Sequence, residues 1–225
     1  MRAMILAAGR GERMRPLTDR TPKPLLIVGG KPLIVWHLER LASAGFAEVI
    51  INHAHLGSQI ESALGNGSQW GLNVQYSPEP TALETAGGIA QALPLLGDSP
   101  FVVVNGDTYT EFDFSTIRHA LVAPSLAHLI MVDNPAQHTE GDFAYQNGRL
   151  LATGAHKLTF SGVGVYQPSL FASIERGQAA KLAPILRTAI EQHLVSATYY
   201  QGVWHDIGTP KRLADLDQQL TARFN

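Results

Sequence analysis

The chain has 225 residues, enough for one large domain with a substantial core, and its 45% hydrophobic and 16% charged residues are typical of a globular protein. The formal net charge of −2 argues against a general nucleic-acid-binding protein, and the lack of cysteine excludes disulfides, zinc–thiolate sites and cysteine nucleophiles. No apolar run approaches the roughly 18 residues of a membrane span, and the N-terminal run ends at Gly9, too early for a signal peptide, so a cytoplasmic protein is expected.

Short apolar runs alternate with segments of helical period. Buried strands are predicted at residues 3–8, 48–52, 73–77, 101–105 and 127–132. Helices are predicted at residues 31–45, 56–65, 84–96, 182–192 and 210–220. A hairpin around Asn147-Gly148 and a strand at 159–168 give the later part a mixed character. This order predicts α/β architecture: a single domain over residues 1–225 with a three-layer α/β/α Rossmann-like fold and a mostly parallel, mixed sheet.

A basic loop with two glycines follows the first strand. Its sequence, AGRGERMRPLTDRTPKP (residues 8–24, the basic loop), contains Gly9 and Gly11, whose backbone amides an anion can approach closely. Arg13 offers a planar cation for phosphate oxygens, and Lys23 is held between prolines, which suits charge developing during a reaction. A solvated basic loop is the simpler alternative. The third glycine of a dinucleotide-binding turn is missing, and no P-loop motif is present.

Two aspartates stand where carboxylates are useful to phosphate chemistry. Asp107 ends VVVNGD after a strand, and Asp206 lies in WHDIGTP before a glycine turn. Carboxylate oxygens are ligands that Mg²⁺ prefers, although a turn or helix-cap role would also explain each aspartate. His53-x-His55 and His205 lack an evident third zinc ligand.

Residues 6–24 resemble the opening motif of the sugar-nucleotidyltransferase family, L-A-A-G-x-G-x-R-(M/L)-x-P-L-T followed by P-K-P. The resemblance implies transfer of a nucleotidyl group from a nucleoside triphosphate to a sugar 1-phosphate, with pyrophosphate leaving. It implies that Lys23 and Arg13 are catalytic, with Lys23 at the α-phosphate and Arg13 and the amides of Gly9–Gly11 at the pyrophosphate. The family's G-D and W-x-D-x-G-T motifs imply that Asp107 and Asp206 bind Mg²⁺.

The resemblance also implies a set of nucleotide-binding residues: Leu6, Ala8, Gly9, Gly11, Glu12, Arg13, Lys23, Glu79, Leu83 and Gly88. The last three lie in SPEPTALETAGGI, which resembles the family's nucleobase segment ending G-T-A-G, with Glu84 in place of the first glycine. Glu79, or a main-chain group near Leu83, is expected to accept a pyrimidine N–H, while the small residues 86–88 let a flat base lie against the backbone. The alternative is a helix capped by Thr81 or Thr85, with its glycines serving close packing.

The sugar side departs from the family. Many members carry E-K-P before a strand ending in G-(L/I)-Y, whereas this chain has ATGAHKLTFSGVGVY. The expected sugar-binding residues are Asn105, Glu140, Gly141, Gly154 and Lys157. Losing the acid lowers repulsion toward a substrate that carries a carboxylate. The chain therefore most resembles the short family members that act on UTP and N-acetylmuramate 1-phosphate in cell-wall recycling, without an acetyl-transfer extension.

Other functions stay open at this point. Mannose 1-phosphate guanylyl transfer and hexose 1-phosphate thymidylyl transfer are the nearest alternatives. A non-catalytic nucleotide-sugar sensor could lose Lys23, Asp107 or Asp206, and all three are present. The expected partners are UTP and a sugar 1-phosphate, with neither nucleic acid nor membrane. The oligomeric state is left open, a monomer included.

Overall fold

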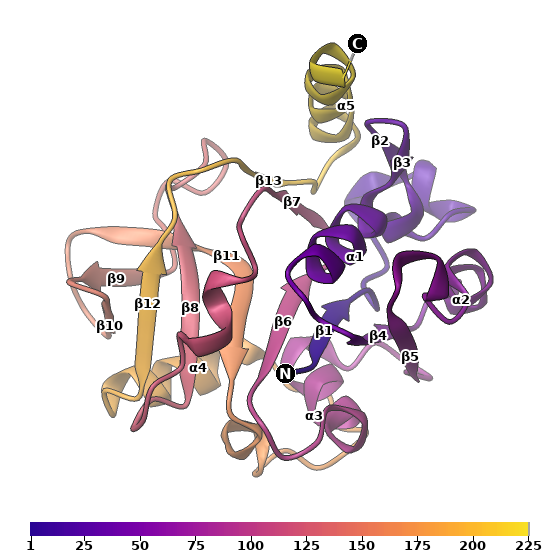
Figure 1. The fold of residues 1–225 in the computed structure, drawn as a ribbon. Helices are drawn as coiled ribbons and strands as arrows, with labels where there is room; N and C mark the ends of the chain where they lie inside the picture. The colour runs from indigo at the N-terminus through magenta and orange to yellow at the C-terminus, as the bar shows by residue number, and fades with distance from the viewer. Residues whose placement is uncertain (225) are drawn as a thin grey trace.

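A computed structural model describes residues 1–224, which form a nine-stranded mixed sheet with the order β5-β4-β1-β6-β11-β8-β12-β10-β9 (Figure 1). Its strands are β1 (Ala3–Leu6), β4 (Glu48–His53), β5 (Asn73–Pro78), β6 (Phe101–Asn105), β8 (Ala127–Val132), β9 (Phe143–Gln146), β10 (Arg149–Leu151), β11 (Lys157–Tyr166) and β12 (Val195–Tyr199). Two small sheets pair β2 (Ile27–Val28) with β3 (Lys31–Pro32), and β7 (Thr108–Thr110) with β13 (Trp204–Asp206).

Helices cover both faces of the large sheet. They are α1 (Leu33–Ser43), α2 (Gly57–Leu64), α3 (Glu84–Leu96), α4 (Leu182–Glu191) and α5 (Pro210–Phe224), with short 3-10 turns at Glu12–Met14, Leu17–Asp19, Lys23–Leu25, Ser68–Trp70, Thr116–His119 and Pro168–Phe171. Apolar side chains of α1 and α2 are buried on one face, and those of α3 and α4 on the other. The three layers therefore match the predicted architecture.

The sheet reverses its strand order at β1. Strand β1 pairs in parallel with β4 on one side and with β6 on the other, where Leu6 stands opposite Asn105. The chain thus leaves β1 toward β4 and β5, and returns to the opposite side at β6. Loops that follow such strands diverge, and ligands of open α/β sheets bind in the crevice between them. The basic loop and the segment after Asn105 flank this crevice.

The structure adds features that the sequence pattern did not predict. Strand β11 runs antiparallel to both β6 and β8, and β12, in parallel with β8, was not predicted at all. The capping alternative for α3 is wrong: Leu83 occupies the N-cap position and no side chain caps the helix. Thr81 and Thr85 therefore do not begin α3 by accepting its amide hydrogens.

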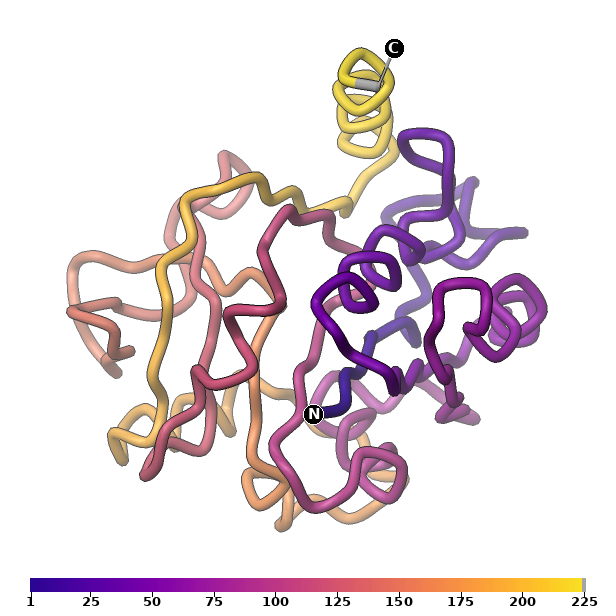
Figure 2. The backbone as a smooth tube through the Cα atoms, viewed as in Figure 1, coloured from indigo at the N-terminus to yellow at the C-terminus, as the bar shows by residue number. Residues whose placement is uncertain are grey.

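Helix α5 lies beside the β2–β3 hairpin, away from the large sheet (Figure 2). The Gly29 amide donates to Oδ1 of Asp217 at 2.7 Å. Gly29 has a φ of +58°, and a Cβ there would lie 2.9 Å from atoms of Leu220, so the hairpin turn and helix require glycine at this contact. Among the described residues, no helix is long and apolar enough to cross a membrane.

Candidate active site

A cavity of about 530 Å³, the main cavity, opens at the carboxyl ends of β1 and β6. Its lining residues are Leu6, Ala7, Ala8, Gly9, Gly11, Glu12, Arg13, Met14, Lys23, Pro24, Asn52, Ala82, Glu84, Thr85, Asn105, Asp107 and Gly208. The predicted nucleotide-binding residues from Leu6 to Lys23 all belong to this lining, together with Asn105 and Asp107. Their contacts with a ligand stay predictions.

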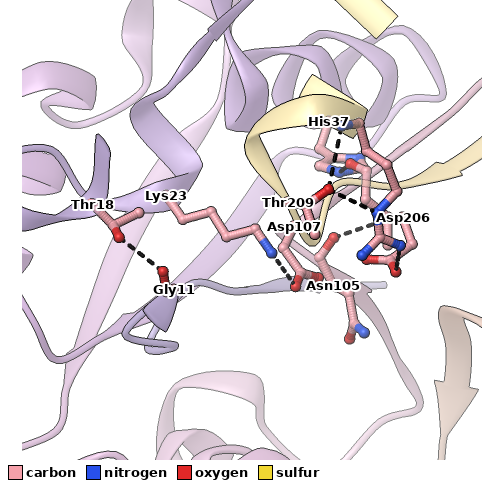
Figure 3. A network of polar contacts seen from close by, with 10 residues as sticks. Gly11, Thr18, Lys23, His37, Asn105, Asp107, Asp206 and Thr209 are labelled. Carbon is pink, nitrogen blue, oxygen red and sulfur yellow. Dashed lines mark hydrogen bonds and ion pairs between the residues drawn. The ribbon is translucent and has the colours of Figure 1, made fainter. Parts of the chain in front are cut away.

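Glycines shape the basic loop in two different ways. A Cβ on Gly9 would meet no atom within 4 Å, so glycine here leaves open space in the main cavity. Gly11 instead has a φ of +64°, and a Cβ there would lie 2.9 Å from Cγ2 of Thr18. The Thr18 hydroxyl donates to the Gly11 carbonyl at 2.8 Å (Figure 3). This bond closes the loop, while anion binding by the amides near Gly9 stays a prediction.

Lys23 and Asp107, which both line the main cavity, form an ion pair. Nζ of Lys23 lies 2.7 Å from Oδ2 of Asp107, and the lysine is buried whereas the aspartate side chain is 42% exposed (Figure 3). The Gly106 amide donates to the Leu6 carbonyl at 2.9 Å, and a Cβ on Gly106 would lie 2.6 Å from that oxygen. Glycine therefore lets the end of β6 press against β1, which directs Asp107 toward Lys23.

Asp206 reaches the same region from β13. It pairs with Thr108 across the β7–β13 sheet, and the Ile207 amide donates to the Asp107 carbonyl at 3.0 Å. The Oδ2 atom of Asp206 lies 2.5 Å from Nη1 of Arg212, a residue of the first turn of α5. Asp206 itself is not among the lining residues of the main cavity, although Gly208 is.

Two carboxylates, Asp107 and Asp206, are the predicted donors for a metal ion here. Among the described residues, no group of three or more histidine, aspartate and glutamate side chains could hold a metal by itself. Asp107 lies in the turn just before β7, and Asp206 ends β13, the strand that pairs with β7. A cation accompanies each carboxylate, Lys23 beside Asp107 and Arg212 beside Asp206. Hard oxygen donors in this number suit a divalent ion that also takes phosphate oxygens and water, so the residues fit.

A buried histidine of α1, His37, forms a hydrogen bond to the backbone of β7. The Nε2 atom of His37 lies 2.7 Å from the Thr108 carbonyl, and burial lowers the pKa of His37 to about 4. The imidazole is therefore neutral at pH 7, and Nε2–H donates to the carbonyl because that oxygen can only accept. The bond fixes the backbone beside Asp107.

A chain of buried hydrogen bonds runs from Ala7 and Asn52, which line the main cavity, to Glu79 and Leu83, which do not. The Ala7 amide donates to Oδ1 of Asn52 at 2.9 Å, and Nδ2 of Asn52 donates to Oε1 of Glu79 at 2.6 Å. Oε2 of Glu79 accepts the Leu83 amide at 2.8 Å. A Cβ on Gly88 would lie 2.6 Å from Oε1, so that glycine admits the carboxylate. This chain ties the end of β1 to the start of α3.

The predicted base-binding residues take part in this chain of hydrogen bonds or pack against it. Glu79, Leu83 and Gly88 are buried and do not belong to the lining of the main cavity. Direct base contacts by them stay predictions, and their observed role is support of the cavity side. Asn52 does line the cavity and was missed, although a polar residue ending a buried strand was a usable signal.

A second cavity of about 360 Å³ lies beside the start of β11. It is lined by Asp133, Asn134, Thr139, Glu140, Ala155, His156, Lys157 and Leu158. The structure thus brings the predicted sugar-binding residues Glu140 and Lys157 together. It places Gly141 and Gly154 outside this lining and Asn105 in the main cavity. The predicted sugar set is therefore divided between the two cavities.

Comparison with known proteins relates this geometry to characterised chemistry. Residues 2–144 match the family described as Nucleotidyl transferase. Over 222 residues the chain is 57% identical to the N-acetylmuramate alpha-1-phosphate uridylyltransferase of Neisseria meningitidis serogroup B, with 96% of both chains covered. It is 30% identical over 225 residues to the mannose-1-phosphate guanylyltransferase catalytic subunit beta of Drosophila pseudoobscura pseudoobscura, covering 93% of this chain and 60% of that one.

The fold also matches a solved structure. A Bacillus anthracis protein assigned as a glucose-1-phosphate thymidylyltransferase, crystallised with sucrose, superposes with a TM-score of 0.87 over 98% of this chain and 95% of that one, at 21% sequence identity. At this identity the likeness shows the fold alone, and it confirms the predicted α/β architecture.

Proposed function

The chain belongs to the nucleotidyl transferase family, and we propose that it transfers a uridylyl group from UTP to N-acetylmuramate 1-phosphate, giving a UDP-sugar and pyrophosphate. One observation carries the reaction type: the main cavity joins an open glycine loop, the Lys23 ammonium and the Asp107 carboxylate at the strand-order reversal. The family match over residues 2–144 covers all three of these features.

The reaction is a displacement at the α-phosphorus of UTP. The phosphate of the sugar 1-phosphate is already an anionic nucleophile, so the protein needs to supply alignment and charge neutralisation, not a general base. Lys23 binds the α-phosphate, where negative charge develops, and Arg13 with the amides of Gly9–Gly11 holds the leaving pyrophosphate. Mg²⁺ is the divalent ion that we assign to Asp107 and Asp206, and it supplies neutralising charge to the phosphate oxygens.

The Lys23–Asp107 contact suits this role in the ligand-free chain. Lys23 is buried between Pro22 and Pro24, so its ammonium needs a counter-ion when no phosphate is present. Asp107 provides it at 2.7 Å and holds the side chain extended into the main cavity. A bound phosphate can then take over the ammonium without a large movement of the backbone.

The sugar assignment is supported by the relative from Neisseria and by the second cavity. That relative, 57% identical, is named for N-acetylmuramate 1-phosphate. Lys157 and His156 line the second cavity, and Ala155 stands near the position where many family members carry an acid. Asp133 and Glu140 line the same cavity, but alanine at position 155 adds no further negative charge opposite a lactyl carboxylate, for which Lys157 offers a counter-ion. We place the reaction in the cytoplasm, where nucleoside triphosphates are available, as part of cell-wall sugar recycling.

A substrate panel tests this assignment. Pyrophosphate release should be fast with UTP and N-acetylmuramate 1-phosphate, and much slower with N-acetylglucosamine 1-phosphate, which lacks only the lactyl ether. Ala155→Glu should lower kcat/KM for the muramate substrate by about tenfold or more, because it adds a carboxylate at the position proposed to face the lactyl carboxylate in a partly desolvated site. The glucosamine substrate should be affected less. Equal wild-type rates with both sugars would remove the muramate assignment, and rapid turnover of GTP with mannose 1-phosphate would favour guanylyl transfer.

A further inference from the structure

Glu84 has a backbone conformation that its side chain disfavours. It is the first residue of α3, and its φ of +59° lies in the left-handed region. Residues with a Cβ clash with their own carbonyl there, so glycine, or sometimes asparagine, normally fills such positions. Non-glycine residues in this region concentrate at binding and catalytic sites, where the side chain offsets the strain by what it contacts.

The Glu84 carboxylate has no structural partner to explain its presence. Glu84 is exposed and lines the main cavity together with Ala82 and Thr85. Among the described residues, no hydrogen bond or ion pair engages its carboxylate. Glu84 therefore combines an unpaired acceptor with a place in the lining of the cavity that the proposed function fills with UTP.

The charges around the main cavity indicate which part of a nucleotide this carboxylate faces. Arg13, Lys23 and the amides near Gly9 give the basic-loop side of the cavity its affinity for phosphate. A carboxylate accepts hydrogen bonds only and repels phosphate, and the lining residues beside Glu84, Ala82 and Thr85, include no cation to offset it. The Glu84 side is therefore less suited to the triphosphate than the basic-loop side, where Arg13 and Lys23 line the cavity. The remaining part of UTP is the nucleoside, which offers three donors: N3–H of uracil and the 2′- and 3′-hydroxyls of ribose.

We propose that Glu84 is a specificity-determining residue whose carboxylate accepts a hydrogen bond from an N–H or O–H donor of the bound nucleoside. This inference rests on the proposed binding of UTP and adds a residue to it. The interaction offsets the left-handed strain at residue 84, which the ligand-free chain bears without compensation from a protein partner.

Glu84→Gly removes both the carboxylate and the backbone strain, so a loss of UTP binding in this variant cannot be attributed to a less stable fold. The melting temperature of the variant should not be lower than that of the wild type. The Kd of the full chain for UTP, measured by calorimetry with Mg²⁺ present, should rise by about tenfold or more, because a hydrogen bond to a charged acceptor is lost. Glu84→Gln keeps the backbone and the side-chain size, and should weaken UTP binding by a smaller factor.

His193→Gly is the matched control. His193 follows α4, is exposed and has a φ of +58°, yet it lines neither cavity. His193→Gly places glycine in the same left-handed backbone region, so it should relieve the same backbone strain as Glu84→Gly while leaving the Kd for UTP unchanged. A purely structural role for Glu84, including interaction of its charge with the N-terminus of α3, predicts the same unchanged Kd for both glycine variants.

Nucleotide analogues identify the donor. If Glu84 accepts from uracil N3–H, the wild type should bind UTP more tightly than 3-methyl-UTP. If it accepts from a ribose hydroxyl, the wild type should bind UTP more tightly than the 2′-deoxy or the 3′-deoxy nucleotide. Glu84→Gly should lose whichever of these preferences the wild type shows through Glu84. The inference is overturned if Glu84→Gly binds UTP within about twofold of the wild type, or if it retains every preference that the wild type shows. Failure of the proposed function gives a different result, since the wild-type chain would then neither bind UTP nor release pyrophosphate.

Discussion

Replacing Lys23 by methionine should damage catalysis far more than it damages the fold. Methionine has a similar length and fills the buried site of the lysine stem, but it carries no charge. If Lys23 neutralises charge that develops on the α-phosphate, kcat should fall about 10²–10³-fold, which corresponds to about 3–4 kcal/mol of transition-state stabilisation. The KM for UTP should rise by a much smaller factor.

The stability cost follows from the exposure of the two partners. Removing one member of a fully buried pair costs about 3–5 kcal/mol, whereas exposed pairs contribute about 0–1 kcal/mol. The Asp107 side chain is 42% exposed, so water can solvate it once the lysine is lost. We therefore expect the free energy of unfolding to fall by about 1–2 kcal/mol, and the melting temperature by about 2–8 °C.

Steady-state pyrophosphate release measures kcat and the KM for UTP, and urea unfolding of the same preparation measures the free energy of unfolding. A variant that loses several kcal/mol of stability but keeps kcat within about fivefold would make Lys23 a structural partner of Asp107 and refute the assigned role. A change confined to the KM for UTP would make it a ground-state phosphate contact instead.

Three further predictions follow from the site and the core. Asp107→Asn and Asp206→Asn should each nearly abolish turnover and weaken Mn²⁺ binding measured by calorimetry, with far-UV circular dichroism unchanged; Mn²⁺ affinity equal to that of the wild type would exclude the residue as a ligand. Gly9→Ala should fold normally, since its Cβ meets no atom within 4 Å, yet bind UTP more weakly. Gly87→Ala should instead lower stability by about 1–3 kcal/mol, because its Cβ would lie 2.3 Å from a backbone carbonyl oxygen; equal melting temperatures would contradict this contrast. Burial lowers the pKa of His128 from 6.5 to about 4, so between these pH values the unfolded chain binds more protons than the folded chain. The contribution of neutral His128 to the free energy of unfolding is therefore complete above pH 6.5 and is lost as the pH falls toward 4. Urea unfolding across this range should show a smaller loss for His128→Gln than for the wild type, and identical slopes would count against it.

Local chemistry made part of the site predictable from the sequence. Glycines and prolines restrict their own backbone, so Gly9, Gly11 and the Lys23 segment could be assigned to a loop before its geometry was known. Asp107 was predictable for a similar reason, because an acidic residue directly after a buried strand lies at the edge of the sheet. These features depend on neighbours within a few residues.

Other features depend on partners far apart in the chain. Lys23 and Asp107 are separated by 84 positions, and nothing in either segment indicates that the two charges pair. Glu79, or a main-chain group near Leu83, was expected to accept a hydrogen bond from the base, and that contact stays a prediction. The sequence did not indicate that the two oxygens of Glu79 accept from the Asn52 side chain and the Leu83 amide, because these contacts arise only when β4 and α3 pack together. Glu84 could be recognised as a substitution in a glycine position, but its left-handed backbone became known only from the structure.

The central claim is uridylyl transfer in the main cavity, and the fate of the α-phosphate of UTP tests it most directly. Purified chain is mixed with UTP labelled at the α-phosphorus, Mg²⁺ and N-acetylmuramate 1-phosphate, and the products are separated by chromatography. The account predicts that the label moves into the UDP-sugar, with one pyrophosphate released for each labelled product. It is contradicted if the label remains in UTP, or if it appears as UMP from hydrolysis without a UDP-sugar.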